Sequence, residues 1–246
     1  MIESLVFASA NPGKITEAKL LLDGIEVIPY ESLLGRMEIE ETGATFKDNA
    51  RLKAETISAR LARPVIADDS GLVIPALDGF PGIRTNRFME ESGGTEAAFA
   101  ELAKRLEGKD TAAYFVCVVA LVMPGQAVKF ATGEVHGFLS FPPRGTGGFG
   151  YDSVFIPNGY GSTFAELGEE VKSQISHRAA AFRKLVSYLA TLKPAVAEPA
   201  AETKKEELVA PKVKSKAPAK SRIRREVKAE EFEEAMHTAE VQKEND

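Results

Sequence analysis

The chain has 246 residues, of which 44% are hydrophobic, and its formal net charge is -5. This length suits one large domain or two small ones, and the hydrophobic content is sufficient for a packed core. The negative balance argues against a surface that is basic throughout and binds nucleic acid. The single cysteine, Cys117, excludes a disulfide framework and a thiolate zinc site and fits a reducing compartment.

The two ends of the sequence differ in character. The first residues carry neither a basic segment nor a long apolar stretch, so we expect no signal peptide, no membrane span and a cytoplasmic protein. From Pro194 onward Ala, Pro, Lys and Glu dominate, and such a segment cannot bury enough surface to offset its ordering entropy. We predict a folded domain over residues 1–193 and a disordered charged tail over 194–246. A nucleic-acid or partner contact through the basic residues 212–228 is the alternative for the tail.

Strand and helix patterns alternate through residues 1–193, which predicts an α/β domain. A short apolar run at 5–8 is typical of a buried strand, and Asn11 and Pro12 then suit the cap and first position of a helix. The remaining expected elements are helices over 45–61, 96–106 and 177–192 and strands over 65–67, 71–77, 113–122 and 127–135.

The turn between the first strand and the first helix could bind a phosphate. Unpaired N–H groups and the helix dipole favour an anion there, and Asn11 and Lys14 belong to the same turn. Its glycine spacing matches neither a Walker loop nor a dinucleotide fingerprint. On its own, such a turn is more often an ordinary capped helix start.

Two acidic pairs, Glu40-Glu41 and Asp68-Asp69, suggest a cation site. We expect Asp68 and Asp69 in a loop at the carboxyl end of strand 65–67, where α/β sheets usually bind ligands. Two converging carboxylates there would hold a hard divalent cation such as Mg²⁺. A solvated acidic turn is the alternative for Glu40-Glu41, whereas adjacent aspartates repel each other unless a partner neutralises them.

Basic residues flank the start of the last predicted helix. Ser176 is a candidate N-cap, which places His177 and Arg178 in the first turn and Lys172 just before it. Positive charge opposes the helix dipole at this end. We therefore expect these side chains to contact an anion or an acceptor-rich ligand.

Four glycines surround Phe149, Tyr151 and Asp152 within residues 145–152. Glycine is unfavourable inside helices and strands but permits close approach to the backbone. Two interpretations follow: an elaborate hairpin turn, or a loop that holds a flat polar ring against an aromatic side chain and Asp152.

Six motifs together resemble the inosine/xanthosine triphosphate pyrophosphatase family, in which they occur in the same order. They lie at residues 9–14, 40–43, 67–72, 80–84, 147–152 and 172–178. The resemblance covers about residues 1–192 and not the tail. It implies an elongated α/β fold with a long mixed sheet and a cleft between two lobes, in a homodimer. It also implies Mg²⁺-dependent cleavage of nucleoside triphosphates of deaminated purines to the monophosphate and pyrophosphate.

The same resemblance implies roles for individual residues. The triphosphate is held by Ser9, Asn11, Lys14, Lys53 and Lys172. Mg²⁺ is bound by Asp69 and by Glu40 or its neighbour Glu41, with Asp68 as the alternate to Asp69. Asp69 also activates the attacking water, and Ser70 contacts the substrate. The base is read by Phe149, Gly150, Tyr151, Asp152, His177 and Arg178, in which Arg178 donates to the purine C6 oxygen, Phe149 stacks and Asp152 accepts from an N–H group.

Two alternatives differ in their expected chemistry. A related septum-inhibitor-like pyrophosphatase would prefer another base, but that group typically opens with Ser-Pro-Arg, where this chain has Asn11-Pro12-Gly13-Lys14. A non-catalytic nucleotide- or RNA-binding protein would lack the catalytic acids, and none is missing.

Overall fold

The computed structural model describes residues 2–192, so the predicted tail at 194–246 lies outside the described residues. The strands are β1 (Ser4–Phe7), β2 (Glu26–Pro29), β3 (Val65–Val73), β4 (Ala112–Val122), β5 (Lys129–Leu139) and β6 (Phe155–Pro157). The α-helices are α1 (Pro12–Leu21), α2 (Glu31–Leu34), α3 (Phe46–Leu61), α4 (Thr85–Glu91), α5 (Thr95–Arg105), α6 (Phe164–Ile175) and α7 (His177–Thr191).

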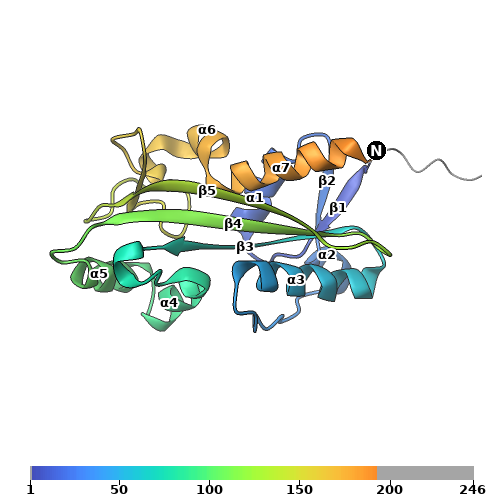
Figure 1. The fold of residues 1–246 in the computed structure, drawn as a ribbon, viewed down its shortest axis with the longest axis horizontal. Helices are drawn as coiled ribbons and strands as arrows, with labels where there is room; N and C mark the ends of the chain where they lie inside the picture. The colour runs from blue at the N-terminus through green and yellow to red at the C-terminus, as the bar shows by residue number, and fades with distance from the viewer. Residues whose placement is uncertain (1, 193–246) are drawn as a thin grey trace, which may run out of the picture. The chain divides into compact units, whose positions relative to one another are not determined.

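The strands form one mixed sheet in the order β2-β1-β3-β4-β5-β6 (Figure 1). β1 is parallel to both of its neighbours, β2 and β3. The pairings of β3 with β4, β4 with β5 and β5 with β6 are antiparallel. This arrangement confirms the α/β class and the mixed sheet.

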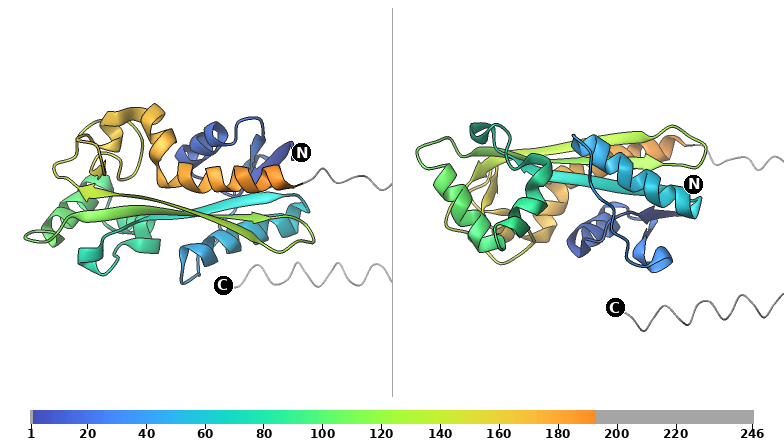
Figure 2. Two further views of the ribbon diagram at one scale, coloured as in Figure 1. Left: turned by 45° about the horizontal axis from the view of Figure 1, so that its top comes forward. Right: turned by 90° about the horizontal axis from the view of Figure 1, so that it is seen from below.

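Helices cover both faces of the sheet, with α3 on one face and α1 and α7 on the other (Figures 1 and 2). Because successive strand residues point to opposite faces, β3 contributes to two separate cores. Ile66 packs with Phe182 and Leu185 of α7, while Val65 and Ala67 pack in the core that contains the alanines of α3. The same alternation decides which face each later residue of β3 occupies.

β3 corrects one prediction, because the expected loop at 68–71 is the middle of a continuous nine-residue strand. Asp68 and Asp69 pair in register with Val119 and Val118 of β4. The antiparallel partner extends past the aspartates and supplies backbone hydrogen bonds there, so the chain has no need to turn. β1, however, pairs with β3 only as far as Ile66, so both aspartates lie just beyond the carboxyl end of β1.

The contact between α7 and β5 depends on a missing side chain at Gly133. A Cβ atom there would collide with the His177 carbonyl oxygen and the Ala181 amide nitrogen. We expect Gly133→Ala to lower the free energy of unfolding by about 1–3 kcal/mol in a urea titration, since extra volume has nowhere to go. Gly161→Ala is the control, because no atom lies within 4 Å of the added Cβ. Equal midpoints for the two variants would contradict this packing.

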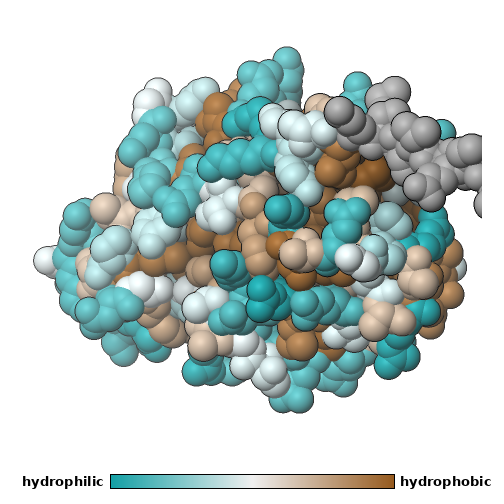
Figure 3. Space-filling model, turned by 45° about the vertical axis from the view of Figure 1, so that its right-hand side comes forward, coloured by the Kyte–Doolittle hydropathy of each residue, from teal (hydrophilic) through white to brown (hydrophobic). Residues whose placement is uncertain are grey.

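Within residues 2–192, no helix is long and apolar enough to cross a membrane. The face drawn in Figure 3 carries hydrophobic side chains interrupted by hydrophilic ones.

Candidate active site

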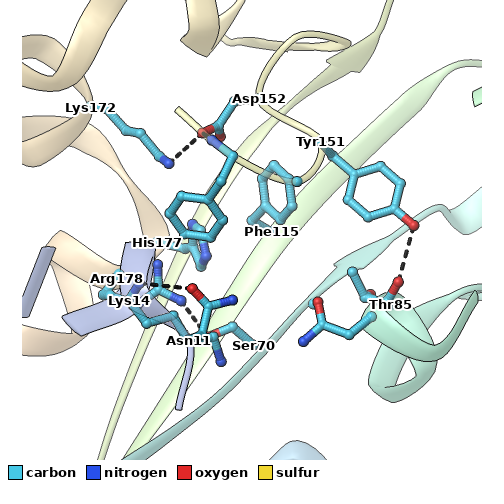
Figure 4. A pocket seen from close by; sticks show the side chains of 14 residues that line it. Asn11, Lys14, Ser70, Thr85, Phe115, Tyr151, Asp152, Lys172, His177 and Arg178 are labelled. Carbon is cyan, nitrogen blue, oxygen red and sulfur yellow. Dashed lines mark hydrogen bonds and ion pairs between the residues drawn. The ribbon is translucent and has the colours of Figure 1, made fainter. Parts of the chain in front are cut away.

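Two cavities meet beside the turn that joins β1 to α1. The aromatic cavity, of about 450 Å³, lies between this turn, β3, the glycine-rich loop 145–152 and the start of α7 (Figure 4). The polar cavity, of about 580 Å³, includes Ser9, Glu41 and Lys53 in its wall. The residues that line both cavities are Asn11, Lys14 and Asn86.

The β1–α1 turn has the predicted cap. The Asn11 Oδ1 atom accepts a hydrogen bond from the Lys14 backbone N–H at 3.1 Å, and Pro12 occupies the first helical position. The Ser9 hydroxyl oxygen accepts from the Asn11 N–H at 3.3 Å. The turn therefore presents the side chains of Asn11 and Lys14 at the junction of the two cavities.

Asp68 and Asp69 lie on opposite faces of the sheet, so they share no cation. Asp68 Oδ2 lies 2.9 Å from Arg178 Nη2 and 3.2 Å from Lys14 Nζ. Burial alone would raise the pKa of the Asp68 carboxyl, but Lys14 and Arg178 hold it well below its usual range. The expected repulsion between adjacent acids is thus relieved, because each aspartate has its own basic partner.

On the other face, Asp69 lies beside Glu41 and the helix α3. Lys53 Nζ is 3.2 Å from Asp69 Oδ1 and 2.6 Å from Glu41 Oε1. Asn49 Nδ2 donates to Asp69 Oδ2 at 3.3 Å. Burial raises the pKa of Asp69 despite the nearby Lys53, and the charge of Glu41 adds to this effect. Glu40, in contrast, is exposed, so the structure brings Glu41 rather than Glu40 to Asp69.

The pair of Asp69 and Glu41 suits a hard divalent cation. Within residues 2–192 no group of three or more acidic, histidine or cysteine side chains converges, so this part of the chain offers at most two carboxylates to one ion. Their oxygens already converge on one positive charge, that of Lys53, at the wall of a polar cavity. Mg²⁺ is commonly bound by one or two carboxylates, with phosphates and waters as its other ligands. The residues therefore fit Mg²⁺.

Glu17 of α1 is a site residue that the sequence reasoning missed. Its carboxylate binds Arg178 Nη1 and lies 2.7 Å from Lys172 Nζ. Lys172 Nζ in turn lies 2.6 Å from Asp152 Oδ2 (Figure 4). The signal was present, because Lys14, Glu17 and Leu21 have the spacing of one helical face. A buried acid on that face requires a basic partner.

Arg178 lies in the first turn of α7, as predicted, but it is only 2% exposed and its guanidinium is buried inside this network. Burial alone would lower the pKa of its guanidinium, but the Asp68 charge raises it. Hydrogen bonds to Asp68, Glu17 and Ser70 use four of its five N–H groups. One N–H on Nη1 has no hydrogen-bond partner within residues 2–192, and Arg178 is among the residues that line the aromatic cavity.

His177 stacks on Phe115, with ring centroids 4.9 Å apart. Burial and the charge of Arg178 lower its pKa well below 6.5, so the ring is neutral. Its Nδ1 atom has no hydrogen-bond partner within residues 2–192. The neutral ring and the guanidinium therefore border the same cavity with different hydrogen-bonding capacity.

The titration of His177 predicts a pH dependence of stability. Below pH 6.5 the unfolded chain protonates this histidine and the folded chain does not, so stability falls as the pH falls, by at most about 1.4 kcal/mol per pH unit. We expect His177→Gln to remove this part of the slope in denaturant titrations below pH 6.5. Parallel curves for the variant and the wild type would show that His177 is protonated in both states.

The glycine-rich loop joins the antiparallel strands β5 and β6, as the hairpin interpretation expects, and its residues 149–152 also line the aromatic cavity. The Phe149 backbone N–H donates to Asp152 Oδ2 at 2.8 Å, and Lys172 Nζ lies 4.3 Å from the centre of the Phe149 ring. Gly148 has a φ of 74°, and a Cβ there would collide with the Asp152 carboxylate. These contacts fix Phe149 and Asp152 together at the cavity wall.

Tyr151, which follows Gly150 in this loop, is bound to the opposite wall of the cavity. Its hydroxyl donates to the Thr85 carbonyl oxygen at 3.1 Å (Figure 4), and its ring packs on Phe99 at 5.7 Å. The side chain is buried, so it holds the loop to α4. Phe149 is the half-buried ring of the loop, with Lys172 Nζ over the ring, and it lines the aromatic cavity.

Comparison with known proteins agrees with this fold. Residues 5–188 match the model of the Ham1 family. The chain is 45% identical over 190 residues to the dITP/XTP pyrophosphatase of Rhodospirillum centenum, covering 75% of this chain and 94% of that one. It is 42% identical over 193 residues to the dITP/XTP pyrophosphatase of Bacillus licheniformis, and the match covers 76% of this chain and 98% of that one. The structure of the Staphylococcus aureus Ham1 protein superposes on this one with a TM-score of 0.70 at 39% sequence identity. The match covers 76% of this chain and 98% of that one.

The chain therefore belongs to the Ham1 family. The matched region ends within α7, and the resemblance found in the sequence motifs is confirmed.

Proposed function

We propose that the protein hydrolyses nucleoside triphosphates of deaminated purines, such as dITP and XTP, to the monophosphate and pyrophosphate with the help of Mg²⁺. The observation that carries the proposal is the pair of joined cavities. One is lined by aromatic side chains and by Arg178, and the other by Glu41, Lys14 and Lys53, with Asp69 3.2 Å from Lys53. A nucleotide has the matching division into a flat base and an anionic chain. The names of the Rhodospirillum and Bacillus relatives support the same substrates.

The polar cavity suits the triphosphate. Lys14 and Lys53 supply positive charge there, and Ser9 and Asn11 supply polar groups from the β1–α1 turn. Asp69 and Glu41 would hold Mg²⁺. Neutralisation of the phosphate charge and a lowered pKa of water are the chemistry that a bound Mg²⁺ supplies. Lys172, by its contacts with Asp152 and Phe149, acts on the base side rather than on the distal phosphates.

Asp69 is suited to act as the general base. Burial raises the pKa of its carboxyl, which makes the carboxylate a stronger proton acceptor. In the proposed reaction a water oxygen bonds to the α-phosphorus, the bond from that phosphorus to the bridging oxygen breaks, and pyrophosphate leaves. Asp69 takes the proton of the water. Lysine charge stabilises the negative charge on the leaving pyrophosphate.

The aromatic cavity suits a purine with an oxygen at C6. The remaining Arg178 N–H can donate a hydrogen bond to that oxygen. The guanidinium has no acceptor atom, so it cannot accept a hydrogen bond from the amino group of adenine. An unmade buried hydrogen bond costs about 1–3 kcal/mol. Asp152 accepts from the N–H edge of the base, Phe149 stacks on the ring, and Ser70, Gly150 and His177 complete the cavity wall.

The products test the reaction type directly. We expect ³¹P NMR of the protein with ITP and Mg²⁺ to show inosine monophosphate and pyrophosphate appearing together. In H₂¹⁸O the label enters the monophosphate, because the water attacks the α-phosphorus. Release of inosine diphosphate and inorganic phosphate would instead indicate a phosphatase that removes the γ-phosphate, and it would contradict the proposal.

We also propose that the enzyme acts as a homodimer in the cytoplasm. Its single, buried cysteine fits a reducing compartment. Size-exclusion chromatography with light scattering tests the dimer, and a monomeric mass at micromolar concentration would contradict it.

A further inference from the structure

Glu41 lies in an irregular segment of the chain that joins α2 to α3. Side chains from neighbouring elements hold the two ends of this segment. At one end the Tyr30 hydroxyl donates to the Met37 carbonyl oxygen at 3.0 Å, and at the other the Gly43 N–H donates to Asn49 Oδ1 at 2.8 Å. The backbone at Glu41 lies between these two anchors and needs a contact of its own to be fixed.

That contact comes from Arg87 of α4, a helix on the same face of the sheet as α3 (Figure 1). Arg87 Nη2 donates to the Glu41 carbonyl oxygen at 2.5 Å. The same nitrogen lies 3.9 Å from Glu41 Oε2, which is too far for a hydrogen bond. Arg87 therefore holds the main chain of Glu41 and leaves its carboxylate to other partners.

Lys53 holds Glu41 in a different way. Its Nζ atom lies 2.6 Å from Glu41 Oε1 and 3.2 Å from Asp69 Oδ1, so it pairs with the same carboxylates that suit Mg²⁺. The lysine contact thus competes with a bound ion. The bond from Arg87 to the main chain does not, and it can persist when the carboxylates bind a cation.

We propose that Arg87 is a positioning residue, which fixes the backbone of Glu41 and so keeps its carboxylate directed towards Asp69 for the cation. The inference rests on the metal site of the proposed function. Without the bond, the segment that carries Glu41 would take additional conformations. The apparent affinity for the ion then falls in proportion to the fraction of molecules in the competent conformation.

Mn²⁺ tests the proposal without turnover, because it takes the same oxygen ligands as Mg²⁺ and its free ion gives an EPR signal. Arg87→Met removes the donor and keeps an apolar side chain. We expect the dissociation constant for Mn²⁺ to rise about fivefold, the effect of one hydrogen bond. The direction is informative, because removal of a positive charge near a cation would by itself tighten binding. Unchanged or tighter binding would overturn the proposal.

Arg84→Met is the matched control, since it makes the same chemical change three residues earlier in the chain. Arg84 Nη2 lies 2.9 Å from Glu91 Oε1, and both side chains are more than half exposed. We expect this variant to bind Mn²⁺ as the wild type does. A rise equal to that in Arg87→Met would assign the effect to general disturbance of α4 and overturn the role of Arg87.

A Glu41→Ala background shows whether Arg87 acts through Glu41. In that background Arg87→Met should change the dissociation constant for Mn²⁺ less than about twofold, because the positioned carboxylate is already absent. A full fivefold rise there would overturn the proposal. Failure of the wild type to cleave ITP would contradict the proposed function. The assignment of Arg87 would still be decided by Mn²⁺ binding, so the two failures are distinguishable.

Discussion

Asp69→Asn should lower kcat with ITP by about 10²–10⁴-fold, the usual contribution of a general base. The amide cannot take the proton of the attacking water, and it is a weaker ligand for Mg²⁺ than a carboxylate. Its size and shape are nearly those of the native side chain, and its one carbonyl oxygen can still accept a hydrogen bond from Lys53 or from Asn49, which lie 3.2 and 3.3 Å from the native carboxylate. We therefore expect nucleotide binding to persist while turnover is lost.

The experiment compares single-turnover rates and equilibrium binding of ITP in the wild type and the variant. Asp23→Asn, the same chemical change at an exposed position, serves as the control and should retain the wild-type rate. Undiminished turnover in Asp69→Asn would remove Asp69 from catalysis. Loss of binding together with turnover would assign it to the metal site alone.

Asp68→Asn should lower the free energy of unfolding by about 3 kcal/mol, because it removes a carboxylate partner from a buried ion-pair network. Arg178 would keep Glu17 as a partner, but Lys14 would lose the carboxylate 3.2 Å away. The measurement is a urea titration at neutral pH, where the low pKa of Asp68 keeps it ionised in the wild type.

Glu91→Gln provides the comparison for that experiment. It breaks the pair of Arg84 and Glu91, whose nitrogen–oxygen distance of 2.9 Å equals that between Arg178 and Asp68. Both side chains are more than half exposed, and such pairs contribute about 0–1 kcal/mol. Similar losses for the two variants would mean that the buried network does not stabilise the fold more than a surface pair.

The elements with strong periodic patterns could be predicted from the sequence. α3 begins after the cap residue Thr45 and ends at Leu61, and α7 begins at His177 after its cap Ser176, both as expected. The patterns are informative there because caps and apolar faces are encoded within a few residues. The short strand β2 and the helix α6 were not predicted, and β6 was anticipated only as one side of the possible hairpin at the glycine-rich loop.

The aspartates of β3 show why the site was harder to predict than the elements. Two adjacent acids are typical of a turn, but pairing with β4 keeps them in a strand, and partner pairing cannot be inferred from local pattern. Because successive residues of β3 point to opposite faces of the sheet, Asp68 binds Arg178 on one face and Asp69 lies by Lys53 on the other. The motif resemblance assigns both residues to one metal site, but it did not indicate which basic side chain each would meet.

The central claim is tested most directly by how the rate of hydrolysis depends on the base of the nucleotide. The measurement is kcat/KM for pyrophosphate release from ITP, XTP and ATP with Mg²⁺. The single unused N–H of Arg178 and the acceptor at Asp152 predict that ITP and XTP exceed ATP by about 10²-fold or more. Equal values for ATP and ITP would contradict a cavity that reads the oxygen at C6.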